Sequence, residues 1–129
     1  MQYEILKYTI LKSVKPFLKI AIMALNRDFK ETVNARIQRD TAFATALLDE
    51  AIYLFLNGEP ETARLILREL VNATIGFEQL AIKTSKPSKS LHRMLSAKGN
   101  PTMDNLTAIF DVLRKTLNVD IKVKTVARS

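Results

Sequence analysis

Polar and basic side chains gather between residues 83 and 100, and they define the most distinctive chemistry of this chain. From Lys83 to Lys98 there are five basic residues and no acidic one. Ammonium and guanidinium groups bind phosphate oxygens, and hydroxyl, amide and guanidinium groups also donate to base edges. This chemistry fits a nucleic-acid surface. Its candidate contact residues are Lys86, Ser88, Lys89, Ser90, His92, Arg93, Lys98 and Asn100.

The cations in this set divide by position. Lys86 and Lys98 flank the second helix of the pattern, where point charges contact phosphates and fix register without reading sequence. Lys89 and Arg93 are four residues apart, so they share one helix face. Either can donate to guanine O6 and N7, and Arg93 can do so with two bonds, worth about 1–3 kcal/mol of discrimination against a wrong base.

The other polar residues have less specific chemistry. Ser88 and Ser90 can bind a base or a phosphate through their hydroxyls, and Asn100 with the Gly99 amide can contact the DNA backbone. His92 is the single histidine of the chain, so a zinc site would lack co-ligands. It is read either as a DNA contact or as a half-buried residue of the helix surface.

The surrounding pattern places these residues on a helix-turn-helix at residues 77–97. A short helix starts at Phe77, a turn follows, and the second helix carries an apolar inner stripe of Leu91, Met94 and Leu95. Residues 99–101, Gly-Asn-Pro, are expected to stop that helix. A basic run alone is ordinarily a solvated face, but this helix pattern favours a surface that enters a major groove.

Helices are also predicted before the helix-turn-helix. Apolar residues recur every four positions over residues 28–38, and Asp40 is a suitable N-cap for a longer, largely buried helix. Asn57-Gly58 ends that helix through a left-handed C-cap, and Pro60 suits the first turn of the next one. These signals predict an all-α, repressor-like domain of about five to six helices.

Two elements are predicted after the helix-turn-helix. Thr102 or Asp104 can start a helix that packs through apolar residues from Leu106 to Leu117. Beyond Asn118 the hydrophobic period becomes two, as in a short β-strand around residues 119–125. A single strand needs a partner, so pairing across a two-fold homodimer is an attractive hypothesis.

Composition agrees with one helical domain that binds an anion. The 129 residues are 47% hydrophobic and carry a net charge of +7. Residues 31–76 hold four basic and seven acidic residues, whereas residues 77–129 hold ten basic and four acidic ones. The chain has no cysteine, which excludes disulfides and cysteine-based zinc sites and suits the cytoplasm.

The apolar stretch over residues 8–25 raises the question of a membrane. Lys12, Lys15 and Lys19 interrupt it, so no uninterrupted run approaches the ~20 apolar residues of a spanning helix. An amphipathic helix on a membrane surface remains an alternative. Packing against the domain or a partner subunit is the preferred interpretation, and no membrane contact is expected.

Catalytic chemistry is not indicated by the sequence. The carboxylate pairs Asp49 with Glu50 and Glu59 with Glu61 fall on a helix surface and at a helix start, where solvation and the helix dipole explain them. His92 has no recognisable nucleophile beside it, and no phosphate-binding glycine loop is present. We therefore expect no enzyme, catalytic residue, cofactor or metal site.

Residues 23–123 resemble the probable addiction-module antidote proteins, a branch of the Cro/repressor-type helix-turn-helix regulators associated with RelE-like toxins. The resemblance lies in MALNRDFKETVNARIQRD at 23–40, LLDEAIYLFLNGEPETARLILRELVNATIGFEQLA at 47–81 and SKPSKSLHRMLSAKGNPTMDNLTAIFDVL at 85–113. Two positions depart from the wider family. Ser85 stands where a turn glycine is common, and Phe77 stands where a phosphate-binding Gln is common.

The resemblance implies a sequence-specific transcriptional regulator that binds double-stranded operator DNA as a homodimer. It also implies an antitoxin that represses its own operon and neutralises a RelE-like toxin. Residues 1–22 would then be an N-terminal extension to a single domain at 23–129. The alternatives are a prophage-type regulator without a toxin and a helical protein-interaction module.

Overall fold

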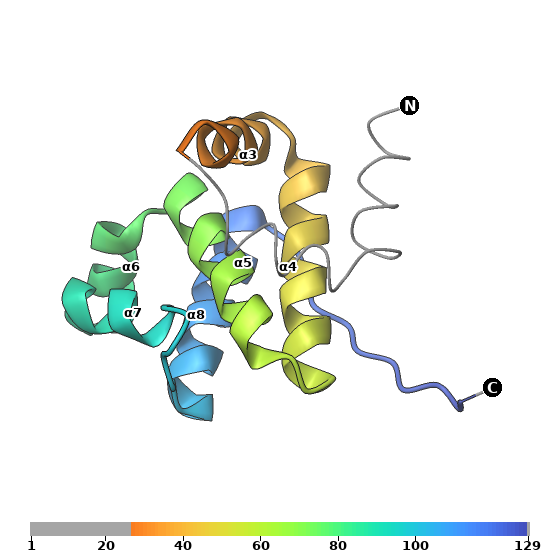
Figure 1. Ribbon diagram of the computed structural model, residues 1–129. Coiled ribbons are helices and arrows are strands. Elements are labelled where there is room, and N and C mark those ends of the chain that lie inside the picture. The colour runs from red at the N-terminus through yellow and green to blue at the C-terminus, as the bar shows by residue number, and fades with distance from the viewer. Residues whose placement is uncertain (1–26, 129) are drawn as a thin grey trace.

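The computed structural model describes residues 27–128, and within them the chain forms six helices (Figure 1). These are α3 (Arg27–Arg39), α4 (Thr41–Leu56), α5 (Pro60–Ala73), α6 (Phe77–Thr84), α7 (Ser88–Met94) and α8 (Met103–Leu117). The prediction of an all-α fold is confirmed for these residues. The predicted extension at residues 1–22 lies outside the described part of the chain.

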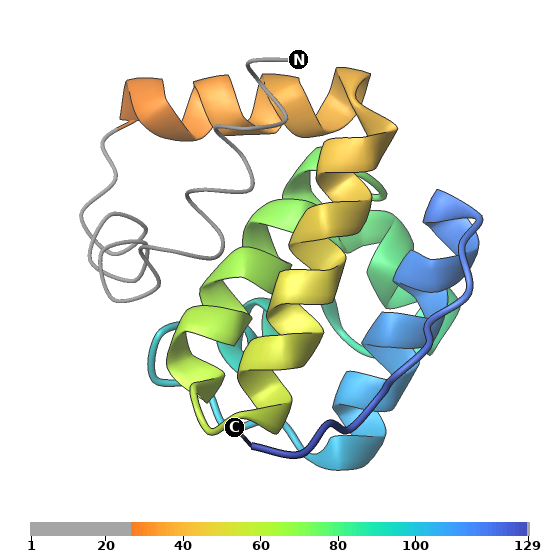
Figure 2. The same cartoon turned by 90° about the vertical axis from the view of Figure 1, so that its right-hand side faces the viewer.

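The helices surround one hydrophobic core. Helices α4 and α5 run side by side, α3 crosses one end of the pair, and α6, α7 and α8 pack on its flank (Figures 1 and 2). Each helix from α3 to α8 contributes apolar side chains to the buried cluster. The fully buried large residues include Leu48, Leu54, Leu67, Leu80 and Ile109. Burial of such side chains holds short helices in place that would be marginal alone.

The helix boundaries follow the capping residues seen in the sequence. The Asp40 side chain accepts a hydrogen bond from the Phe43 amide at 3.1 Å and so caps α4. Gly58 has a left-handed conformation with φ 85°, which lets the Glu59 amide donate to the Leu54 carbonyl at 2.8 Å. The predicted end of α4 is therefore confirmed.

The start of α8 is settled between the two predicted candidates. The Thr102 hydroxyl oxygen accepts a hydrogen bond from the Asn105 amide at 3.1 Å, so Thr102 is the N-cap. Asp104 lies in the first turn, where its charge interacts favourably with the helix dipole.

The predicted strand after Asn118 is wrong for the described residues, which contain no strand. Residues 119–128 are extended but make no ladder. Val119 and Ile121 are instead half-buried against the helical core. The alternation places these two side chains on the helices, whereas Val123, the next apolar residue, is exposed. A strand needs the edge of another strand, which no described residue supplies.

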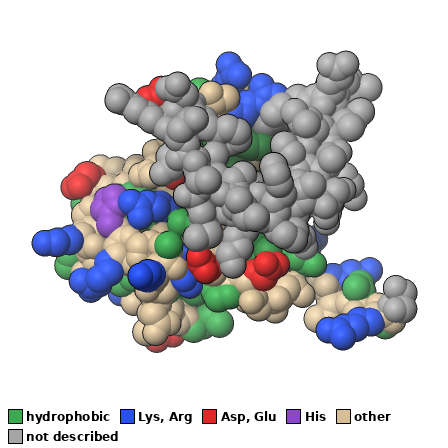
Figure 3. Space-filling model, in the orientation of Figure 1, with side chains coloured by type: hydrophobic (Ala, Val, Ile, Leu, Met, Phe, Trp, Pro, Cys, Tyr) green, Lys and Arg blue, Asp and Glu red, His purple; other side chains and the backbone are tan. Residues whose placement is uncertain are grey.

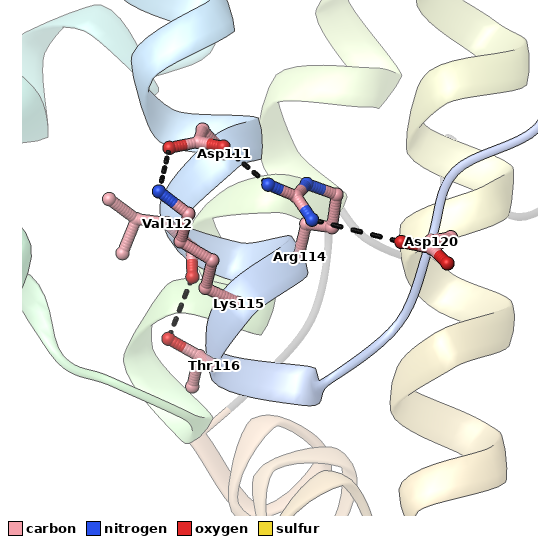
Figure 4. A network of polar contacts seen from close by, with 6 residues as sticks. All are labelled: Asp111, Val112, Arg114, Lys115, Thr116 and Asp120. Atoms are coloured by element: carbon pink, nitrogen blue, oxygen red, sulfur yellow. Dashed lines mark hydrogen bonds and ion pairs between the residues drawn. The ribbon is translucent and has the colours of Figure 1, made fainter.

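An ion pair at the surface connects α8 to the start of this extended segment (Figure 4). The Arg114 guanidinium lies 2.8 Å from the Asp111 carboxylate and 3.8 Å from the Asp120 carboxylate. The Lys115 ammonium lies 2.9 Å from the Asp111 carboxylate. The hydrogen bonds from Lys115 and Arg114 lower the pKa of the Asp111 carboxyl below its ordinary value. The Val119 amide also donates to the Arg114 carbonyl at 3.0 Å, so the direction in which the chain leaves α8 is defined.

The turn between α6 and α7 has the conformation that a glycine would adopt. Ser85 has φ 55° and ψ 40°, in the left-handed region, and the Lys86 amide donates to the Ala81 carbonyl at 3.1 Å. A side chain in this region costs roughly 1–2 kcal/mol. The turn is thus the sharp one that a glycine would also form, and backbone hydrogen bonds from Ser85 to Ile82 and from Lys86 to Ala81 close it.

Replacing Ser85 by Gly should stabilise the protein by about 0.5–1 kcal/mol, because the relief of strain exceeds the entropy that a glycine loses on folding. Urea unfolding monitored by circular dichroism measures the change. Ser90→Gly, inside α7, is the matched control and should destabilise by about 0.5 kcal/mol. Equal effects of the two substitutions would contradict the left-handed turn.

Candidate nucleic-acid interface

Helix α7 separates an apolar inner face from a polar outer face. Leu91 and Leu95 are fully buried, whereas Lys89 and Arg93 are exposed. The loop after the helix exposes Lys98 and Asn100, and the remaining candidates, Lys86, Ser88, Ser90 and His92, are half-buried. The structure therefore brings all eight predicted contact residues onto α7 and the turns at its two ends. Only four of them have largely open side chains.

The surface charge on this side of the molecule is mainly positive. Figure 3 shows Lys and Arg side chains gathered over α6 and α7. Lys83, Lys89 and Arg93 are exposed cations of these helices. An anionic polymer that approaches this side gains Coulomb attraction and releases counterions, so its binding weakens as salt rises.

His92 has a structural contact that the sequence patterns did not reveal. Its ring stacks on that of Phe77, with the ring centroids 3.8 Å apart and the planes at 18°. Phe77 is buried at the start of α6, so the pair joins the outer side of α7 to α6. His92 is half-buried on the helix surface, and its contact with DNA stays a prediction. Phe77 thus makes a packing contact at the start of α6.

Helix α7 ends earlier than predicted. Its last residue is Met94, whereas the sequence signal for a stop was Gly-Asn-Pro at residues 99–101. Residues 95–99 instead fold into turns, in which the Ser96 hydroxyl donates to the Arg93 carbonyl at 2.7 Å and the Gly99 amide donates to the Ser96 carbonyl at 3.0 Å. Side-chain and turn hydrogen bonds take over the carbonyls that another helical turn would have used.

Arg64 of α5 holds these turns in place. Its Nε donates to the Ser96 carbonyl at 3.0 Å and its Nη2 donates to the Ala97 carbonyl at 2.7 Å. The residue is buried with 9% of its surface exposed. A guanidinium fork fits two neighbouring carbonyls, and its charge interacts favourably with the negative end of the α7 dipole. Arg64 therefore links the central helix α5 to the end of α7.

Gly99 allows the same turns to pack against α7. A Cβ at this position would lie against the Met94 carbonyl oxygen and 2.6 Å from the Arg93 carbonyl oxygen. Both contacts involve backbone, which cannot move aside as a flexible side chain can. The glycine is needed here for close approach, since it is not among the glycines with positive φ.

The sequence also indicates that Arg64 is buried, although this residue is not part of the helix-turn-helix pattern. Arg64, Leu67 and Val71 follow the helical spacing of three and four residues, so Arg64 lies on the buried stripe of α5. A charged residue at a core position needs hydrogen-bond partners. That rule indicates a buried anchor, but it does not say which carbonyls the anchor holds.

No protein-family model, curated protein or solved structure matches this chain. What α6 and α7 do is therefore inferred from their own geometry and chemistry. Among the helices that the structure describes, none is both long enough and apolar enough to cross a membrane.

Removing the guanidinium should loosen α7 at its end. Arg64→Met leaves the Ala97 carbonyl without its donor and the Ser96 carbonyl with the Gly99 amide alone, and we expect it to destabilise the protein by about 1–3 kcal/mol in urea unfolding. Arg68→Met, one turn along α5 at a half-buried position, is the control and should cost less than about 1 kcal/mol. Similar losses of stability in the two variants would show that Arg64 contributes no more than a half-buried arginine of the same helix.

The stacking of His92 on Phe77 predicts a difference between two substitutions. His92→Ala should cost about 0.5–1.5 kcal/mol of stability, because it removes a stacked aromatic pair, whereas His92→Phe should retain it. Thermal unfolding compares the variants. If His92→Phe destabilised as much as His92→Ala, stacking would not be the role of this side chain.

Proposed function

We propose that this chain is a sequence-specific DNA-binding regulator of the helix-turn-helix class, with α7 as its recognition helix. The observation that carries the proposal is the position of Lys89 and Arg93, exposed side by side on a helix whose opposite face is buried in the core. A major groove admits one α-helix, and base reading requires donors held in a fixed orientation. Arg64 and the Phe77–His92 stack support that orientation.

The candidate contacts keep separate roles in this proposal. Arg93 and Lys89 read bases, whereas Lys86, Lys98 and Asn100 at the two ends of α7 bind the phosphate backbone. Ser88 and Ser90 are half-buried, so their hydroxyls contact only those DNA groups that come close to the start of α7. His92 helps to position α7 through its stack on Phe77, and its contact with DNA stays a prediction.

The biological setting is proposed from the resemblance of residues 23–123 to antidote proteins. In that setting the protein acts in the cytoplasm as a homodimer, represses its own operon and neutralises a RelE-like toxin. A two-fold dimer would place two copies of α7 one helical turn of DNA apart and would read a palindromic operator. No catalytic step, cofactor or metal belongs to this function.

DNA binding is tested by gel-shift titration on the DNA upstream of the encoding gene. Lys89→Ala with Arg93→Ala should weaken the specific complex at least 10-fold, since each base that is read contributes about 1–3 kcal/mol. The charge-matched control is Arg39→Ala with Lys115→Ala, which removes two exposed cations from α3 and α8. This control should retain the specific complex.

The outcomes distinguish the alternatives. A double variant at α7 that binds as tightly as the wild type would show that the recognition face is wrongly assigned. Absence of any specific complex with the wild type would favour a protein-interaction module. The antitoxin role is tested by co-purification with the product of the adjacent gene. If that gene encodes no RelE-like protein, a regulator without a toxin is the better interpretation.

A further inference from the structure

A second basic region lies away from α7. Residues 122–128, here called the basic segment, read KVKTVAR and contain Lys122, Lys124 and Arg128 with no acidic residue. Every residue of the basic segment is exposed, so none of them stabilises the core. The segment leaves the body on the side remote from α6 and α7 (Figure 1). Its charge therefore needs an explanation other than folding or the recognition helix.

The basic segment has a defined starting point. Val119 and Ile121 pack on the helical core, Asn118 turns the chain with φ 56°, and Arg114 pairs with Asp120 at 3.8 Å. These contacts end before Lys122. Residues 118–121 are therefore held against the helices, and the basic segment continues from them as an extended chain. Its three like charges repel one another and favour this extended conformation.

We propose that the basic segment is a second DNA-binding element, which contacts the phosphate backbone of double-stranded DNA without reading its sequence. An extended run of cations matches a line of phosphates and releases their counterions on binding. It offers neither a helix nor a two-stranded ribbon to fill a major groove, and base specificity is therefore not expected. The inference rests on the proposed function only in that α7 also brings DNA to the chain.

The phosphates bound by the basic segment differ from those beside α7. Asp and Glu side chains lie between the two basic regions in the view of Figure 3. Glu59 and Glu61, at the start of α5, belong to the acidic part of the chain. One continuous phosphate track across this acidic surface is disfavoured. The segment consequently reaches the flank of the bound site or a second stretch of DNA, and the tether to α7 raises its effective concentration there.

A membrane surface is the other polyanion that such a segment can meet. Peripheral anchors combine cations with bulky apolar residues such as Trp, Phe or Leu that enter the lipid boundary. The basic segment has only Val123, Val126 and Ala127 as apolar residues, and a few cations without such residues bind lipid weakly. The composition therefore favours DNA.

The test measures the affinity of the full chain for a short random-sequence duplex over a series of salt concentrations. The variant is Lys122→Gln with Lys124→Gln, and the charge-matched control is Arg39→Gln with Arg68→Gln, which removes two cations from α3 and α5. The plot of log affinity against log salt has a negative slope, and its magnitude should fall by up to about 1.8 in the variant, because each phosphate that is no longer neutralised removes about 0.9. The magnitude should fall by much less in the control. Equal changes in the two proteins would overturn the proposal.

Two further arms separate the alternatives. The same pair of substitutions is placed in the Lys89→Ala, Arg93→Ala background, where the fall in slope should persist. Absence of a specific operator complex with the wild type, together with a persistent fall in the salt dependence, would overturn the proposed function and leave this inference intact. Vesicles of phosphatidylcholine and phosphatidylserine form the second arm. Vesicle binding that needs Lys122 and Lys124, with unchanged duplex binding, would show that the segment is a membrane contact instead.

Discussion

The guanidinium of Arg64 holds the carbonyls of Ser96 and Ala97, and the orientation of α7 depends on this contact. A seven-residue helix has too few internal hydrogen bonds to be stable alone, so its direction must come from the rest of the protein. Leu91 and Leu95 supply burial, which is nondirectional. The two hydrogen bonds from Arg64 add direction, because a planar fork accepts only a narrow range of carbonyl positions.

The two ends of α7 are set by backbone geometry. At its start, Ser85 adopts a left-handed conformation that brings α6 and α7 into a sharp turn. At its end, Gly99 approaches the carbonyls of Arg93 and Met94 more closely than any side chain permits. The stack of His92 on Phe77 then ties the helix to α6. Together with the hydrogen bonds from Arg64, these three constraints hold the exposed side chains of α7 in a defined orientation, as the proposed base recognition requires.

The helices were predictable to a useful degree because their signals are local. The Asp40 cap, the Asn57-Gly58 stop and Pro60 each act within one helical turn, and the structure follows all three. The strand beyond Asn118 was not predictable, since alternation shows only that every second residue is covered. In this fold Val119 and Ile121 are covered by helices. The end of α7 was mispredicted for a related reason, because Arg64, a residue distant in sequence, holds the turn at Ser96 and Ala97 that follows the helix.

The amino-acid sequence by itself determined the helical class of the protein, most helix boundaries and the basic character of the α6–α7 region. These properties follow from hydrophobic period, capping and net charge, which are carried by residues close together along the chain. Only the tertiary structure decided which candidate side chains are exposed to solvent and which pack against other side chains. Lys89 and Arg93 remain exposed, whereas His92 stacks on Phe77, because packing between helices sets how each face is turned. It also decided the role of Arg64, whose partners lie more than thirty residues away.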